Sequence, residues 1–318
     1  MPRAGGDFQH TDFSRIGDSL RPGDLLVLND TKVFPARLLG HRVPSGGAVE
    51  CLLLSALGND HWDALMHPGQ KLKPGAQVLF ERDGVQLHGE VIAHHFHGRR
   101  TIRLWADEGV STVDAIDRIG HVPLPPYIKR DDNTSDRERY QTVYARERGS
   151  VAAPTAGLHF TDDLLRALAS SGVERADVTL HVGYGTFNPV RAERVEDHLV
   201  HPESFAVSAA AAGALTRARR DGRRIIAIGT TTARTLESLR IDDEGRVEAS
   251  SGDTRLFIRP GHEFRVVNGL MTNFHLPRSS LLMLVAAFAG REHVLEAYRE
   301  AVARRYRFYS YGDVMLIV

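Results

Sequence analysis

The chain has little cysteine, and it lacks a long apolar run. Cys51 is the single cysteine among 318 residues, which excludes an intrachain disulfide and a cysteine metal cluster and is typical of a reducing compartment. No run of about 18 apolar residues indicates a membrane span, and the N-terminus has no basic region followed by an apolar core. We therefore expect a cytoplasmic protein without membrane contact.

Net charge is also absent. The 40 basic and 40 acidic side chains balance to a formal charge of zero, so no global field predicts a nucleic-acid partner, although local basic patches remain open. The hydrophobic fraction of 42% and the charged fraction of 25% are ordinary for a globular protein. A length of 318 residues favours two domains.

Short apolar runs separated by turn residues fill the first third of the sequence. "DLLVLND", "ARLLG" and "VECLLLSAL" predict strands. Further short runs follow as far as Trp105, with "PGQKLKPG", "RDG" and "HG" between them, which indicates a small β-barrel or sandwich. "STVDAIDRIG" predicts a helix capped by Ser111, "HVPLPPYIKR" an extended connector and "DDNTSDRERYQ" a surface loop.

After Ser150 the pattern changes to strands that alternate with helices, which predicts an α/β domain. "FTDDLLRALASSG" predicts a helix with Thr161 as its N-cap, and "TNFHLPRSS" precedes an apolar helix capped by Ser279 or Ser280. Because the early strands have no helices of their own, we expect them to join the later sheet. The prediction is an α/β fold (a complex α+β core) with an inserted small all-β barrel domain: core 1–56, barrel 57–148, core 149–318.

Three loops share one design, in which a strand ends, small polar residues follow and a helix begins. They are "APTAGLHFT", "GTTTART" and "TNFHLPRSS". Ligands bind at the carboxyl ends of strands in α/β folds, and helix N-termini offer free N–H groups to anions. We expect the three loops to line one site, although each alone is equally typical of a capped helix or turn. "GTTTART" lacks the Gly-Lys-Ser/Thr ending of a P-loop, and "HVGYGTF" lacks the third glycine of a dinucleotide fingerprint.

Two further polar stretches have competing interpretations. His198, His201 and Glu203 in "EDHLVHPESF" are candidate metal ligands, a general acid/base group or surface residues, but their spacing matches no standard zinc signature. The connector side chains Tyr127 and Lys129 suit stacking on a base and pairing with phosphate, or belong to a solvated linker. A second basic candidate surface has the arginines Arg217, Arg219, Arg220, Arg223 and Arg224.

Together these segments resemble one family, the S-adenosylmethionine:tRNA ribosyltransferase-isomerases of queuosine biosynthesis. The resemblance runs in order from Arg21 to the C-terminus. It is carried by "RPGDLLVLNDTKVFPARLLG", "VPLPPYIKR", "RYQTVYA", "SVAAPTAGLHFT", "VTLHVGYGTFNPV", "HLVHPESF", "IIAIGTTTARTLES", "TNFHLPRSSLLMLVAAFAG" and "YRFYSYGDVML".

The resemblance implies an α/β core with an inserted barrel, and it implies a reaction. S-adenosylmethionine would donate its ribosyl moiety to 7-aminomethyl-7-deazaguanine at the wobble position of a tRNA, giving epoxyqueuosine, adenine and methionine. S-adenosylmethionine is then a consumed substrate, and no metal or redox cofactor is expected. The implied partners are S-adenosylmethionine and tRNA, and we expect a monomer.

Such a reaction needs a base for the carbon beside the sulfonium and an acid for the leaving adenine. Membership of the matching motifs and residue chemistry select three groups of side chains. For proton transfer we select His159, His201, Glu203 and His275. For substrate binding we select Asp30, Arg37, Thr155, Gly157, Thr231, Thr232, Arg234 and Asn273. For tRNA binding we select Tyr127, Lys129 and Arg130.

One departure from the family pattern concerns the start of the chain. The family has a few dozen residues before "RPGDLLVLND", including an S-R-L-L strand, and most of them are lacking after Met1 here. We expect that strand to neighbour "DLLVLND", so its loss would leave an unpaired edge and a poorly active form, or Met1 would be an internal start. The alternatives are a noncatalytic tRNA-binding homologue and an S-adenosylmethionine-dependent methyltransferase.

Overall fold

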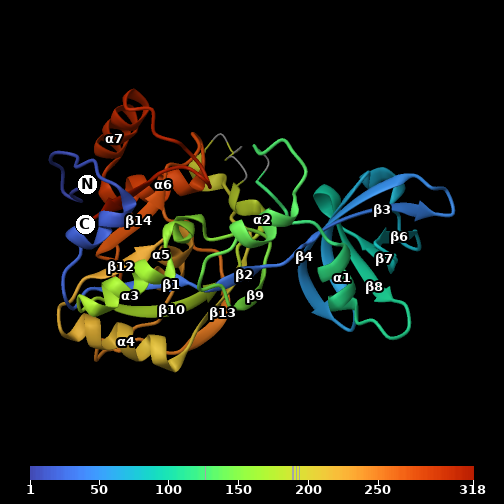
Figure 1. The fold of residues 1–318 in the computed structure, drawn as a ribbon, viewed down its shortest axis with the longest axis horizontal. Helices are drawn as coiled ribbons and strands as arrows, with labels where there is room; N and C mark the ends of the chain where they lie inside the picture. Colours follow the sequence, from blue (N-terminus) through green and yellow to red (C-terminus); the bar gives the residue numbers. More distant parts are fainter. Residues whose placement is uncertain (126, 188–189, 191, 193) are drawn as a thin grey trace. The chain divides into compact units, whose positions relative to one another are not determined.

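The computed structural model describes residues 1–125, 127–187, 190, 192 and 194–318, and it divides into two compact units (Figure 1). Unit one comprises Met1–Lys32, Tyr140–Glu147 and Ala153–Val318, and unit two comprises Val33–Arg139 and Arg148–Ala152. A two-stranded sheet of β2 (Thr31–Val33) and β9 (Glu147–Ser150) contains the boundaries between them.

Unit one is built on a sheet to which the described residues contribute seven strands, in the order β13-β11-β10-β1-β12-β14-β15. Strands β10, β1, β12 and β14 are parallel, whereas β11, β13 and β15 are antiparallel to their neighbours. Their bounds are β1 (Leu25–Asn29), β10 (Glu174–Leu180), β11 (Glu203–Val207), β12 (Ile225–Ile228), β13 (Ser250–Thr254), β14 (Gly269–Asn273) and β15 (Val314–Ile317).

Strand β1 lies at the centre of this sheet. All five of its residues are buried, and it pairs with β10 on one side and β12 on the other. The predicted strand at "DLLVLND" is therefore confirmed, but the expected unpaired edge beside it is wrong. Both neighbours come from later in the chain, and sequence alone does not specify which strands pair across such separations.

Helices cover both faces of the sheet, because residues along a strand alternate between them. Leu26 and Leu28 pack with η1, η4 and α3, and Leu25 and Val27 pack with α4, α5 and α6. Figure 1 shows α3, α4, α5 and α6 around the strands of unit one. The α-helices are α3 (Asp162–Ser170), α4 (Ala209–Arg220), α5 (Thr230–Glu237), α6 (Ser280–Ala289) and α7 (Arg291–Ala303), and the 3₁₀-helices are η1 (Phe13–Ser19), η4 (Thr155–His159), η5 (Tyr184–Phe187) and η6 (Val195–Asp197).

The order of the strands reverses at β1. After β1 the chain returns through η4 and α3 on one face to form β10, and after β10 it crosses on the other face through α4 to form β12. The segments that leave β1 and β10 thus run to opposite faces of the sheet. In open α/β sheets such a reversal marks the point at which ligands bind, outside the carboxyl ends of the strands.

Unit two is a closed antiparallel barrel in the order β3-β4-β5-β8-β7-β6, as far as its residues are described. Its strands are β3 (Arg37–Val43), β4 (Ala48–Gly58), β5 (His61–His67), β6 (Gln77–Arg82), β7 (Val85–His94) and β8 (Arg99–Ala106), and its helices are η2 (Gly69–Lys71), η3 (Phe96–Gly98), α1 (Thr112–Ile119) and α2 (Thr134–Arg139). The predicted α/β fold with an inserted all-β barrel is confirmed.

The barrel begins earlier than the sequence predicts. Unit two starts at Val33, whereas the expected boundary at residue 57 falls inside β4. Strands β3 and β4 pair with β6 and β5 of the barrel and not with the core sheet. Their apolar runs resemble that of β1 in composition, so only the pairing distinguishes a barrel strand from a core strand.

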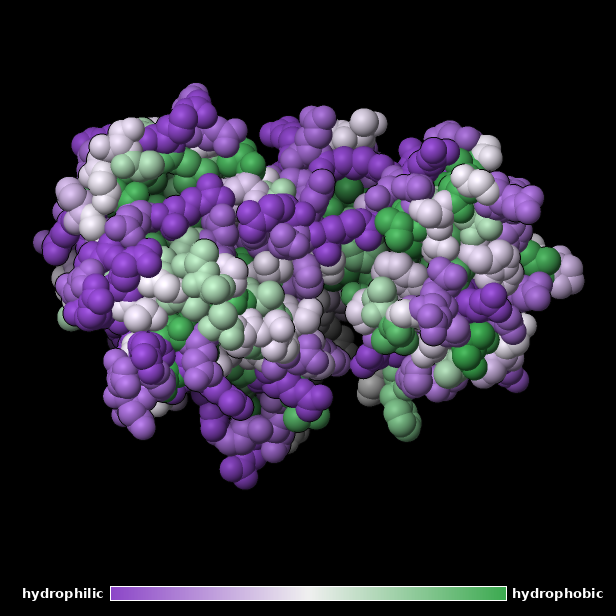
Figure 2. Space-filling view, turned by 90° about the horizontal axis from the view of Figure 1, so that it is seen from below, coloured by the Kyte–Doolittle hydropathy of each residue, from purple (hydrophilic) through white to green (hydrophobic). Residues whose placement is uncertain are grey.

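Local helix signals in the sequence are accurate. Ser111, Thr161 and Ser279 are the N-caps of α1, α3 and α6, and each accepts a hydrogen bond from a backbone N–H of the first turn. In the described part of the chain, no helix is both long and apolar enough to cross a membrane. Figure 2 shows hydrophilic side chains spread over the visible face of both units, interrupted by smaller apolar areas.

Candidate active site

Polar side chains gather at the carboxyl edge of the parallel strands of unit one. Asn29 ends β1, His181 follows β10, Gly229 follows β12 and Asn273 ends β14. Because the four strands are parallel, these residues lie at one edge of the sheet. "GTTTART" and "TNFHLPRSS" therefore share this edge, as predicted.

At the end of β1, two buried side chains hold the end of β10. The Asn29 amide donates to the Leu180 carbonyl oxygen at 2.9 Å and accepts from the Leu180 N–H at 3.0 Å. Asp30 is 1% exposed and accepts from the Thr179 hydroxyl at 2.7 Å and from Arg146 at 2.6 Å. Burial raises the pKa of Asp30, and the Thr179 hydrogen bond and the Arg146 charge oppose this rise.

Glu203, the first residue of β11, forms a buried ion pair with Arg234 of α5. Glu203 is 4% exposed and also accepts from the Gly183 N–H at 2.9 Å and the Thr186 hydroxyl at 2.5 Å. Arg234 is 7% exposed, and its Nε donates to the Leu256 carbonyl oxygen at 2.9 Å. Its Nη2 has no hydrogen-bond partner within the described residues. The pair therefore fixes the loop after β10 to α5 and leaves one donor unused.

The loop "APTAGLHFT" forms η4 and is tied to the end of β14. The Thr155 hydroxyl donates to the Asn273 side-chain oxygen at 2.8 Å, and the Asn273 amide lies 3.4 Å from the Gly312 carbonyl oxygen. His159, the last residue of η4, bonds the backbone of Gly312. Burial lowers the pKa of His159. Three of the predicted residues thus meet at one turn.

His275 lies just beyond β14 in a closely packed position. Its Nε2 is 2.7 Å from the Thr272 hydroxyl, and its backbone N–H donates to the Tyr298 hydroxyl at 2.7 Å. Burial lowers the pKa of His275 to about 4, so the ring is neutral at neutral pH.

The threonines of "GTTTART" are buried at the start of α5. The Thr232 hydroxyl donates to the Ile228 carbonyl oxygen at 2.7 Å, which satisfies it within its own segment. The Thr231 hydroxyl accepts from the Asn29 amide at 3.4 Å and thereby joins the ends of β1 and β12. Of the two, Thr231 is the one that contacts another part of the edge.

Gly157, also in η4, lies against the buried Thr142 and the partly buried Tyr144 of unit one. A Cβ at this position would lie 2.0 Å from the Tyr144 hydroxyl oxygen and 2.9 Å from Thr142 Cγ2. Neither the Tyr144 nor the Thr142 hydroxyl has a hydrogen-bond partner within the described residues. Close packing therefore requires glycine here.

Gly157→Ala should lower the free energy of unfolding by about 1–3 kcal/mol, because the added methyl group overpacks this contact. Tyr144→Phe removes the obstructing oxygen, so a Gly157→Ala/Tyr144→Phe double variant should recover much of the loss. Urea denaturation measures both effects. Gly252→Ala is the matched control, since a Cβ there meets nothing within 4 Å. A double variant no more stable than Gly157→Ala would show that the Tyr144 contact is not the cause.

His201 and its neighbour His198 lie apart from these hydrogen bonds. His201 is exposed and lies against Gly185, and His198 contacts the Phe257 ring at 5.2 Å between centroids. Within the described residues, no group of three or more His, Cys, Asp or Glu side chains is placed to hold a metal ion.

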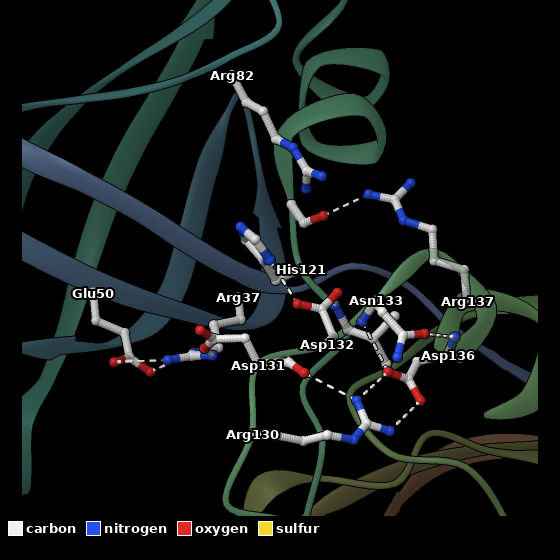
Figure 3. Close-up of polar contacts among 12 residues, drawn as sticks. Arg37, Glu50, Arg82, His121, Arg130, Asp131, Asp132, Asn133, Asp136 and Arg137 are labelled. Carbon is white, nitrogen blue, oxygen red and sulfur yellow. Dashed lines mark hydrogen bonds and ion pairs between the residues drawn. The ribbon is translucent and has the colours of Figure 1, made fainter.

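The remaining predicted residues belong to unit two. Arg37 pairs with Glu50 at 2.8 Å and lies 3.6 Å from Asp131 (Figure 3). Figure 3 also shows Arg130 between Asp131 and Asp136, and its two Nη atoms contact the Asp136 carboxylate at 2.6 and 2.8 Å. Both guanidinium groups are thus engaged inside unit two. Tyr127 is partly buried and Lys129 is exposed.

The stretch "DDNTSDRERYQ" is not the predicted surface loop, because it contains α2. Asp136 is 3% exposed and accepts from Arg130 and from the Asn133 N–H, and Arg137 donates to the carbonyl oxygens of Asp117 and Gly120 (Figure 3). Mutual pairing of these charged groups orders a segment whose composition resembles that of a solvated loop.

The arginines at the end of α4 are also largely paired. Arg220 contacts Asp221 at 3.2 Å, Arg223 contacts Glu174 at 2.9 Å and Arg224 contacts Asp24 at 2.5 Å. Arg219 donates to the Arg265 carbonyl oxygen at 2.5 Å, whereas Arg217 is exposed. This surface is therefore less basic than the sequence indicates.

Sequence reasoning missed His181 and Thr31, which lie between the ends of β1 and β10. His181 Nδ1 is 2.7 Å from the Thr31 hydroxyl. The signal was available, since "VTLHVGYGTFNPV" contains His181 and "RPGDLLVLNDTKVFPARLLG" contains Thr31.

The fold and these polar side chains define an α/β protein with an inserted β-barrel, whose candidate active site lies at the carboxyl edge of the core sheet. A family model described as "Queuosine biosynthesis protein" matches residues 1–317. The chain belongs to this family.

Relatives with curated names are similar to this chain along its whole length. An S-adenosylmethionine:tRNA ribosyltransferase-isomerase of Heliobacterium modesticaldum is 50% identical over 318 residues, which cover 100% of this chain and 91% of that protein. One from Anaeromyxobacter sp. is 52% identical over 320 residues, covering 100% and 90%. The crystal structure of S-adenosylmethionine tRNA ribosyltransferase from Thermotoga maritima is similar to 96% of this chain and 86% of its own chain, at 38% identity and a TM-score of 0.49.

Proposed function

We propose that this chain is an S-adenosylmethionine:tRNA ribosyltransferase-isomerase. It transfers and isomerises the ribosyl moiety of S-adenosylmethionine onto 7-aminomethyl-7-deazaguanine at the tRNA wobble position, and the products are epoxyqueuosine-tRNA, adenine and methionine. The observation that carries this proposal is the similarity of relatives with that name over 100% of the chain. S-adenosylmethionine is consumed as a substrate.

The carboxyl edge of the sheet suits the chemistry of this reaction. A base removes a proton from the carbon beside the sulfonium, and an acid protonates the departing adenine. Partly buried neutral histidines such as His159 and His275 suit proton transfer, whereas the three donors around Glu203 favour a positioning role. Thr155, Asn273, Thr231 and the unused Nη2 of Arg234 offer polar contacts for the methionine carboxylate and the adenosine.

One incubation tests the proposal. The protein is mixed with S-adenosylmethionine and a tRNA that carries the precursor base, and adenine release is followed together with mass spectrometry of the nucleosides. Adenine and epoxyqueuosine are expected. S-adenosylhomocysteine as the product would identify a methyltransferase instead, and tRNA binding without adenine release would identify a noncatalytic homologue.

Affinity for tRNA should fall with salt despite the zero net charge, because local phosphate contacts release counterions. If the protein makes two phosphate contacts, its affinity for tRNA should fall about tenfold between about 50 and 200 mM salt. Lys129 is an exposed cation of the connector, and Lys129→Gln should reduce the slope of log K against log salt by about 1. Fluorescence anisotropy with labelled tRNA measures this, with Lys73→Gln as the control. Equal slopes for the two variants would exclude Lys129 from the phosphate contacts.

A further inference from the structure

His181 lies where the strand order of unit one reverses. It follows β10 directly, beside the end of β1, and the chain leaves these two strands toward opposite faces of the sheet. This is the place in an open α/β sheet at which a ligand is expected. The backbone N–H of His181 donates to the Ser204 carbonyl oxygen at 2.9 Å, which fixes the start of the loop.

Thr31 holds His181 through its ring nitrogen Nδ1. The Thr31 hydroxyl lies 2.7 Å from Nδ1 of His181 and 3.4 Å from the Glu147 carbonyl oxygen. A hydroxyl that donates its single hydrogen to Glu147 accepts from a proton on Nδ1, and this is the tautomer that a base acting through Nε2 requires. Among the described residues, none forms a hydrogen bond with Nε2. In this tautomer Nε2 keeps its lone pair and is the basic nitrogen of the ring.

The charges around His181 are those of Asp30 and Glu147. Burial lowers the pKa of His181, and these two carboxylates oppose the change. Asp30 is in turn bonded to Thr179 and Arg146, which reduces its influence. The ring is thus neutral near pH 7, while the nearby carboxylates stabilise the imidazolium that forms on proton uptake.

The other histidines at the edge are less suited to the same step. In His275, Nε2 is already bonded to the Thr272 hydroxyl, and a pKa of about 4 makes it a weak base. His159 bonds the Gly312 backbone and packs against the Phe13 ring at 5.1 Å between centroids.

We propose that His181 is the base that removes the proton from the carbon beside the sulfonium of S-adenosylmethionine, and that Thr31 is its positioning residue. The inference rests on the proposed function. In the step, the C–H bond breaks, its electron pair stays on the carbon next to the positive sulfur, and the proton forms an N–H bond at Nε2 of His181. The imidazolium then holds a proton for the leaving adenine.

The test compares His181→Gln with His10→Gln, the latter at a histidine that contacts Tyr306 and Glu300 instead. Adenine release with the precursor tRNA should fall by about 100-fold or more in kcat for His181→Gln. The KM for S-adenosylmethionine and the thermal midpoint should stay close to those of His10→Gln.

Thr31 provides a readout that a purely structural role would not change. Thr31→Val removes the acceptor of the Nδ1 proton, so the imidazolium loses a partner. The acid limb of the kcat/KM profile should move to lower pH, and Thr31→Ser should restore it.

The outcomes separate the two proposals. A wild-type protein that releases no adenine refutes the proposed function and with it this role of His181. An active wild type together with a His181→Gln variant within about twofold of His10→Gln in kcat overturns only the inference. Should His181→Gln fail to fold, ring-nitrogen chemical shifts of His181 in the wild type decide: a proton on Nδ1 supports the assignment, and a proton on Nε2 overturns it.

Discussion

Replacing Arg234 with methionine should lower the free energy of unfolding of unit one by about 3 kcal/mol, at the lower end of the cost of breaking a buried ion pair. The substitution leaves the Glu203 carboxylate buried without its cation, since Glu203 is only 4% exposed. The Gly183 N–H and the Thr186 hydroxyl still donate to that carboxylate, which limits the loss. Far-UV circular dichroism in urea suits the measurement, because α3 to α7 belong to unit one.

Two further variants make this result specific. A Glu203→Met/Arg234→Met double variant removes both charges, so it should be more stable than Arg234→Met alone. Arg246→Met breaks an exposed pair with Asp242 and should leave the unfolding midpoint nearly unchanged. If Arg234→Met has no larger effect than Arg246→Met, the buried pair does not stabilise the fold.

The parts of this fold that sequence predicts well are local. A helix cap requires only a few neighbouring residues, which is why Ser111, Thr161 and Ser279 are identified from their own segments. The buried strand β1 is likewise evident from five apolar and small polar residues in a row. The inserted barrel follows from evenly spaced short runs.

Pairing between distant segments is what sequence does not reveal. Strand β4 contains "VECLLL", which is as apolar as β1, yet it pairs with β5 of the barrel. The partners of β1 follow it by about 150 and 200 residues in the pairing of Leu25 with Glu174 and Ile225. Composition predicts that each segment is a strand, but it does not predict which strands pair with it.

The candidate site shows the same division. Thr155 and Asn273 are 118 residues apart and share one hydrogen bond, and both are identifiable from their polar loops. His181 and Thr31 are 150 residues apart, and the bond that fixes the ring depends on the pairing of β1 with β10. Arginine is a residue type that often binds anionic ligands, but Arg37 and Arg130 form ion pairs with carboxylates of unit two.

Acid should destabilise the protein, and His275 should account for a large part of the effect. Its pKa is lowered from 6.5 to about 4 in the folded state by burial. As the pH falls below 6.5, the unfolded chain takes up a proton at this residue while the folded chain does not, so stability is lost down to about pH 4. The expected loss from this residue is about 3 kcal/mol.

His275→Gln removes the titrating ring and keeps a polar partner for the Thr272 hydroxyl. Wild type and variant must be compared at two pH values, because the lost packing of the imidazole lowers the stability of the variant at every pH. The relevant quantity is the difference in unfolding free energy between wild type and variant, measured in urea at about pH 7.5 and about pH 4.5. That difference should shrink, or reverse sign, at the lower pH. The partly buried histidines His159 and His181, whose pKa values are also lowered, remain in both proteins and cancel in the comparison. A difference that stays constant between the two pH values would show that the His275 ring has the same pKa in the folded and unfolded states. The ring would then not be kept neutral by burial at the position where it contacts Thr272 and its backbone N–H contacts Tyr298.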